Sequence, residues 1–180
     1  MLEEVDHHEN DHQWKRTGNN FSDGGRAIDV RTQNGHVVVR WNIVHDMVAL
    51  QDVDDSGSGV NVSQGRQVEI YHNTFYNLPP PSGTASPAGY AIRFGGQGGK
   101  IGLASILNNI VMNADMNMYI NLPEIDKLVS DHNLFFPAKP TPFRINFNDT
   151  SFLDWQIQVY GYDCRSIVPN NFSFVGPGDF

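Results

Sequence analysis

The chain has a single cysteine, Cys164, among its 180 residues, and basic residues are scarce: 12 Lys and Arg stand against 20 Asp and Glu. One cysteine cannot form an internal disulfide, so a domain of this length must be held together by its apolar core. The net charge of −8 argues against a nucleic-acid backbone as partner. No apolar run approaches the ~18 residues of a membrane span, which argues against such a span.

The N-terminal residues Met1 to Glu4 lack the basic start and the apolar stretch of a signal peptide. The sequence therefore leaves the cellular compartment open.

One short motif occurs four times. Its second residue is Asn, and an apolar residue follows two places later. Apolar residues also precede the Asn by five and usually three places, a period of two that predicts a strand. Because a straight strand would put the apolar residues on either side of the Asn on opposite faces, we expect the chain to bend there, with the Asn itself in the left-handed conformation. The four copies are Trp41–Asp46, His72–Asn77, Asn108–Asn113 and His132–Phe136.

Spacings of 31, 36 and 24 residues separate the four Asn residues, which indicates repeated turns with loop insertions of different length. If successive turns stack at the ~4.8 Å spacing of neighbouring strands, the Asn side chains would form a hydrogen-bonded ladder. The ladder would comprise Asn42, Asn73, Asn109 and Asn133.

A second pattern, four residues long, occurs in turn with the Asn motif along the chain. Its side chains are expected to point outward, inward, outward and inward in succession. With no helical run between the two patterns, the chain is typical of a β-solenoid of about five coils. The inward pairs expected are Ile28/Val30, Val60/Val62, Ile92/Phe94, Ile120/Leu122 and Ile145/Phe147.

These strands and Asn bends resemble those of right-handed parallel β-helix proteins of the pectate-lyase-like superfamily, over residues 24 to 180. The resemblance implies an all-β fold, a right-handed parallel β-helix, and an extracellular or cell-surface location. It also implies a carbohydrate-active or carbohydrate-binding protein, related to polysaccharide lyases or glycoside hydrolases. This fold hosts many activities, so a non-catalytic surface, adhesion or self-associating solenoid stays open, as does whether the chain is an enzyme.

Three regions are expected: an irregular polar segment at 1–23, the parallel β-helix at 24–148, and a helix with a tail at 149–180. Asp149, Thr150 and Ser151 offer a helix N-cap, and Phe152 and Trp155 recur at helical spacing. A short solenoid leaves strand edges at its ends, so we also expect a homodimer or higher oligomer.

The outward residues of the second pattern should form one polar column suited to a polysaccharide, whose hydroxyls need donors and acceptors. Arg93 is the candidate base or carboxylate clamp at its centre, and Asp29 is the candidate acid. The alternative is a solvated polar face that binds nothing. Predicted substrate-binding residues are Arg31, Asn61, Tyr119, Asn121, Arg144 and Asn146.

Asp52, Asp54 and Asp55, followed by Gly57, resemble the start of a Ca²⁺-binding loop, because hard oxygen ligands suit that ion. The distal Glu of an EF-hand is absent, so a plain acidic turn is the alternative.

Overall fold

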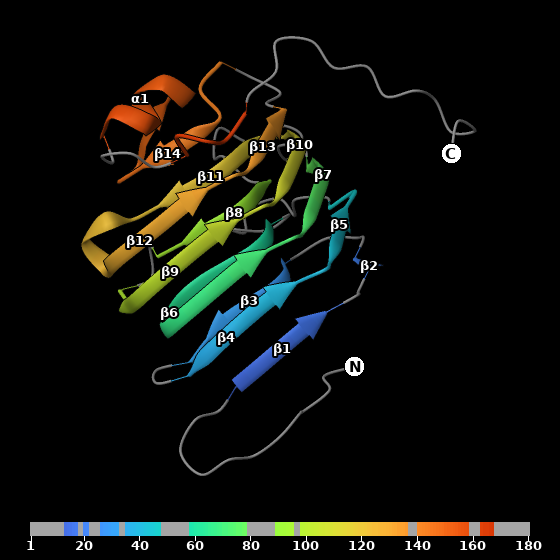
Figure 1. Ribbon diagram of the computed structural model, residues 1–180, viewed down its shortest axis with the longest axis vertical. Helices are drawn as coiled ribbons and strands as arrows, with labels where there is room; N and C mark the ends of the chain where they lie inside the picture. Colours follow the sequence, from blue (N-terminus) through green and yellow to red (C-terminus); the bar gives the residue numbers. More distant parts are fainter. Residues whose placement is uncertain are drawn as a thin grey trace.

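The strands of this protein are stacked in three columns of parallel neighbours (Figure 1). The computed structural model describes residues 13–17, 20–21, 26–32, 35–47, 58–78, 89–95, 98–136, 140–158 and 163–167.

The first column contains the strands that precede each motif Asn, and its strands run parallel in register. It consists of β1 (Gln13–Thr17), β4 (His36–Arg40), the second half of β6 (Ser58–Tyr71), β9 (Ile101–Leu107) and β12 (Ile125–Asp131).

The second column contains the short strands that follow each motif Asn, and it forms a five-stranded parallel sheet. It consists of β2 (Asn20–Phe21), β5 (Ile43–His45), β7 (Thr74–Leu78), β10 (Ile110–Ala114) and β13 (Leu134–Phe136).

The third column contains the strands of the second sequence pattern. Because β6 runs through both the third and first columns, these two form one curled sheet. The chain visits the third, first and second columns in the same order at each pass. The third column consists of β3 (Arg26–Arg31), the first half of β6, β8 (Tyr90–Phe94), β11 (Met116–Ile120) and β14 (Phe143–Ile145).

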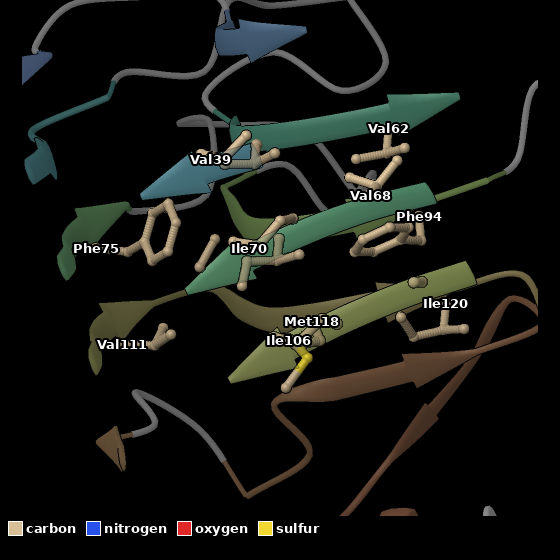
Figure 2. Close-up of a cluster of buried hydrophobic side chains, with 14 of the residues drawn as sticks. Val39, Val62, Val68, Ile70, Phe75, Phe94, Ile106, Val111, Met118 and Ile120 are labelled. Atoms are coloured by element: carbon tan, nitrogen blue, oxygen red, sulfur yellow. The ribbon is translucent and has the colours of Figure 1, made fainter. Parts of the chain in front are cut away.

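Apolar side chains from all three columns meet in one interior (Figure 2). Alternation places them there, since each strand turns every second side chain inward. Rows of buried residues run along the stack at equal positions, and burying each such side chain contributes about 1.5–3 kcal/mol. One row of the third column is Ile28, Val60, Ile92, Met118 and Phe143.

The C-terminal end of the stack is covered by α1 (Phe152–Gln158). Its Trp155 is fully buried and stacks on Phe143 with ring centroids 5.0 Å apart. The hydroxyl of Ser151 accepts a hydrogen bond from the Asp154 amide at 3.1 Å, which confirms the predicted N-cap. No helix in the described part of the chain is long and apolar enough to cross a membrane.

The four motif Asn residues form a buried ladder, as predicted. Asn42 donates to Asn73 at 2.9 Å, Asn73 to Asn109 at 3.0 Å, and Asn109 to Asn133 at 3.1 Å. Each amide also donates to a backbone carbonyl of the strand before it or of the neighbouring coil. The ladder therefore holds the bend between the first and second columns closed at each of the four motif copies.

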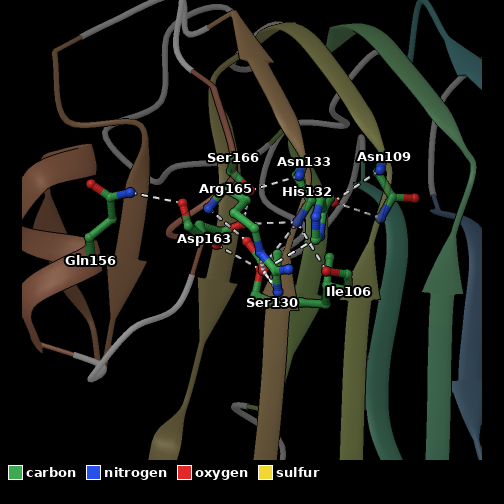
Figure 3. Close-up of polar contacts among 10 residues, drawn as sticks. Ile106, Asn109, Ser130, His132, Asn133, Gln156, Asp163, Arg165 and Ser166 are labelled. Carbon is green, nitrogen blue, oxygen red and sulfur yellow. Dashed lines mark hydrogen bonds and ion pairs between the residues drawn. The ribbon is translucent and has the colours of Figure 1, made fainter.

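The ladder ends on Asp163, which the sequence did not predict as part of it (Figure 3). This fully buried carboxylate accepts hydrogen bonds from Asn133 Nδ2 at 2.9 Å and Trp155 Nε1 at 2.7 Å. The hydroxyls of Ser130 and Ser166 donate to it at 2.7 and 2.5 Å. One carboxylate thus joins the ladder to the helix that covers the end.

The left-handed residue of each bend is the one before the Asn, contrary to the prediction. Trp41, His72, Asn108 and His132 have φ between 54° and 60°. The Asn that follows must turn its side chain into the ladder, and the left-handed residue ahead of it makes that turn. A bend needs only one left-handed residue. The change of face that predicted the bend could not say which of the two residues adopts that conformation.

Two strands lie where the sequence predicted irregular structure. Both β1 and β2 fall within residues 1–23 and pair parallel with β4 and β5. Strand pairing joins backbone groups, which every residue except proline can offer in full, so these strands form without the apolar alternation by which the other strands were recognised.

Candidate functional site

The predicted outward column exists, but its register differs from the prediction. Asp29, Asn61 and Arg93 are neighbours on successive strands, as predicted. Arg93 is then followed by Tyr119 and Arg144, where Asn121 and Asn146 were expected. A shift of two residues keeps every side chain on its own face, so alternation alone cannot detect it.

The middle of this column is enclosed, whereas the sequence predicted a solvent-facing surface. Asn61 is fully buried, and Arg93 and Tyr119 are only 7% and 2% exposed. The accessible residues lie at the two ends: Asp29 and Arg31 at one, Asn146 and Phe147 at the other. A long ligand therefore cannot lie along the whole column in this conformation.

The Arg93 guanidinium lies against two tyrosine rings. Its Cζ is 5.2 Å from the ring centre of Tyr119 and 5.8 Å from that of Tyr90. Both rings sit in a small buried cluster with Met116. Burial raises the pKa of Tyr90 to about 12, although Arg144 opposes this, and it also raises the pKa of Tyr119. Both phenols therefore stay neutral donors at physiological pH.

Arg144 links this cluster to the surface. Its Nε donates to Asp149 Oδ1 at 2.6 Å, and its Nη1 donates to the Tyr90 hydroxyl at 3.4 Å. The antiparallel pairing of β14 with β15 (Asn148–Thr150) sets Asp149 directly opposite Arg144. The guanidinium is thus fixed in orientation beside the buried tyrosines.

Asp29, the predicted acid, is engaged by several donors. Arg26 and Arg31 both contact its Oδ2, at 3.1 and 2.9 Å, and Asn61 donates to its Oδ1 at 2.8 Å. Asn61 also lies between Asp29 and Arg93 in the column. The structure therefore does not bring the two predicted catalytic residues into contact.

Asn121 and Asn146 lie at the ends of their strands. Asn121 donates to Glu124 Oε1 at 2.7 Å, just before the short helix η1 (Leu122–Glu124). The side-chain oxygen of Asn146 accepts from the Leu122 amide at 2.9 Å. Both amides therefore stabilise the chain where it leaves the column.

Phe147 is the residue of this region that sequence reasoning placed wrongly. It was expected inward, but it is 68% exposed and has a φ of 69° in the two-residue turn between β14 and β15. A bulky residue rarely adopts this conformation. Its ring centre lies 5.7 Å from that of Tyr119. The turn-forming residues Asn146 and Asn148 on either side were the available signal.

The proposed Ca²⁺ ligands Asp52, Asp54 and Asp55 lie outside the described residues. Among the residues that the structure does describe, no group of three or more His, Cys, Asp or Glu side chains could hold a metal ion.

The accessible end of the column therefore combines an exposed aromatic ring, an oriented arginine and polar amides. Comparison of the chain with protein-family models, curated proteins and solved structures returns no match.

Proposed function

We propose that this chain is a right-handed parallel β-helix of the pectate-lyase-like superfamily that binds carbohydrate at the C-terminal end of its third column. The fold proposal is supported by parallel pairing in three columns that the chain visits in constant order. Its handedness follows the general preference of parallel crossovers. A crystal structure with left-handed coils would contradict it.

The exposure of Phe147 is the observation that carries the binding proposal. Its φ of 69° is a strained conformation for a bulky side chain, with a cost on the order of 1–3 kcal/mol. Glycine would adopt this turn without strain, and Asn-Gly is the preferred pair for it. An aromatic ring kept exposed at such a position is suited to stack on the apolar face of a sugar.

Polar groups beside the ring supply the hydrogen bonds that sugar hydroxyls need. Arg144, held by Asp149, lies on the strand that leads into the Phe147 turn. Tyr119 lies between Phe147 and Arg93, so a small movement of its ring would open the guanidinium to a ligand.

Binding is favoured over catalysis by the state of the two candidate catalytic residues. Arginine keeps its charge at physiological pH, so Arg93 suits a clamp for a carboxylate or hydroxyl better than a base. Asp29 is engaged by two arginines and an amide, and Asn61 separates it from Arg93 in the column. The proposal includes Ca²⁺ at Asp52, Asp54 and Asp55, where the ion would aid the binding of acidic sugars.

The test is a binding screen of acidic and neutral polysaccharides, with and without Ca²⁺, followed by calorimetry of Phe147→Gly. We expect this variant to lose at least ten-fold in affinity while melting at a higher temperature than the parent. Leu153→Ala is the control, because it also removes an exposed large apolar side chain, 64% exposed, but from α1 and not from the turn between β14 and β15. It should bind as the parent does.

Two results would overturn the proposal. One is carbohydrate affinity unchanged in Phe147→Gly, and the other is no binding to any polysaccharide of the screen. The same mixtures, assayed for unsaturated products and new reducing ends, test the enzymatic alternative, since a lyase gives both products, whereas a hydrolase gives new reducing ends without unsaturation.

A further inference from the structure

The central row on the outward side of the second column carries no charged side chain. It comprises Ile43, Thr74, Ile110, Leu134 and Ile167, the last joined to Leu134 by a bridge. Three of these are exposed large apolar residues: Ile43 at 45%, Ile110 at 36% and Ile167 at 60%. The outward side of the first column carries the ion pair of His36 with Glu69 at 2.9 Å, and in the second column the pair of His45 with Asp46, at 2.7 Å, lies two to three residues past the central row.

A second row runs beside this apolar row, at the left-handed residues of the bends. It comprises Trp41, His72, Asn108, His132 and Arg165. Trp41 is 56% exposed and stacks on His72 with ring centres 4.5 Å apart. The Arg165 side chain is 70% exposed although its guanidinium contacts Asp131 at 2.6 Å. We call the two rows together the neutral face.

We propose that the neutral face is the contact surface for a second copy of this chain, related by a two-fold axis that runs along β10. Rotation about this axis keeps the direction of the strands and reverses the order in which they are stacked. The first residue of each row in one copy therefore meets the fifth residue of that row in the other copy, and the third residue meets its own equivalent. Ile110 then packs on Ile110, and Ile43 packs on Ile167. In the second row, Trp41 meets Arg165, and Asn108 meets Asn108.

The pairings across this axis are complementary, and this argues for a second copy as the occupant. The ring of Trp41 attracts the partner's guanidinium as a cation–π pair. Two Asn side chains facing each other can exchange hydrogen bonds, since each has both a donor and an acceptor. The chain carries a net charge of −8, so two copies repel least across a face whose central row has no carboxylate.

The size of the face sets how strong the contact is. Five stacked segments at ~4.8 Å spacing, each about five residues long from the bend into the strand, give roughly 300 Å² per copy. Stable complexes bury about 800 Å² per partner. The dimer should therefore be weak, with a dissociation constant of about 0.1 mM or above.

Sedimentation equilibrium from micromolar to millimolar concentration tests this. The average mass of the parent should rise from 20.1 kDa toward twice that value. Ile110→Asp places two carboxylates on the axis and should keep the protein monomeric throughout. Leu103→Asp is the matched control, because Leu103 is partly buried on β9 and its strand neighbours Gln67 and Lys127 are partly buried or exposed. It should associate as the parent does.

Crosslinking tests the axis itself. In a Cys164→Ser background, a short bismaleimide should join Ile110→Cys into dimers much faster than Leu103→Cys at equal concentration. A monomeric parent at every concentration would overturn the proposal, and so would association that survives Ile110→Asp or equal crosslinking of the two cysteine variants. None of these outcomes bears on carbohydrate binding, which involves the third column.

Discussion

The repeated motif builds two ladders, one inside the molecule and one on its surface. The inner ladder is formed by the second residue of each motif, and its members are 1–2% exposed. The outer ladder is formed by the fourth residue after it: Asn77 donates to Asp46, and Asn113 donates to Asn77 at 3.1 Å. All three of its members are exposed and left-handed, with φ between 49° and 53°.

The difference between the ladders is in what replaces a lost hydrogen bond. Water can satisfy an exposed amide, so a bond in the outer ladder contributes little net stability. In the inner ladder, removing one Asn leaves buried backbone carbonyls and a buried amide without partners, each costing about 1–3 kcal/mol. The same residue type at the same spacing therefore has different energetic weight, and burial alone decides it.

The largest effect is expected at the end of the inner ladder. Asp163→Ala removes the shared acceptor of Asn133, Trp155, Ser130 and Ser166. We expect a loss of roughly 3–5 kcal/mol in the free energy of unfolding, measured by chemical denaturation. Exposed Asp154→Ala, which loses only a helix-cap bond, should lose less than half as much. Equal losses in the two variants would contradict the role of Asp163.

The two ladders are compared directly by Asn109→Ala and Asn113→Ala. Asn109 accepts from Asn73 and donates to Asn133 and the Ile70 carbonyl, so its loss should cost about 2–3 kcal/mol. Asn113→Ala should cost at most about 1 kcal/mol, mainly from left-handed backbone strain.

Asn113→Gly isolates that strain. Glycine accepts a φ of 49° freely, so this variant should unfold within about 0.5 kcal/mol of the parent. A large loss in Asn113→Gly would show that the outer hydrogen bonds matter as much as the inner ones.

The burial of Tyr90 should make the free energy of unfolding depend on pH. Burial raises the pKa of Tyr90 from 10.0 to about 12, so the unfolded chain releases this proton first as the pH rises. The contribution of neutral Tyr90 to stability is therefore fully present below pH ~10 and is lost as the pH rises toward ~12. Between pH 8 and 11 the parent should lose about 1 kcal/mol more than Tyr90→Phe, as measured by denaturation at each pH. Parallel curves would argue that Tyr90 is hydrated.

The smallest change in the free energy of unfolding is expected at Asn108, which is compared with Asn109 in the same bend. Asn108 is exposed and has a φ of 54°, whereas Asn109 is buried in the ladder. Asn108→Gly should change the free energy of unfolding by less than about 0.5 kcal/mol, because glycine suits this conformation. Asn109→Gly should be destabilising by several times more. The reverse order, seen in thermal melts, would restore the left-handed role to Asn109.

Several features of the molecule could be predicted from residues alone. The period of two identified the inward residues of β4, β6 and β8, and the recurring Asn identified the ladder with its members. Ser151 and Trp155 identified the start and the buried face of α1. These features depend on local spacing, and spacing is written in the sequence.

The candidate site was predicted less well. Arg93 and Tyr119 lie in the predicted column, but the register of β11 and β14 was shifted by two residues, and Phe147 was placed inside. Alternation fixes which face a side chain occupies, not its neighbour on the next strand. The burial of Asn61 and Arg93 could not be predicted either, because a side chain that points out of a sheet is exposed only if no other part of the chain covers it.

The sequence by itself thus determined the strands on either side of each motif Asn, their inward faces and the Asn ladder, because each follows from residues within a few places of one another. Only the tertiary structure decided which outward residues meet, which of them water reaches, and that Asp163 closes the ladder 30 residues beyond Asn133. Those properties depend on contacts between segments far apart in the sequence. A local period contains no information about the register of such segments or about which residues they bury.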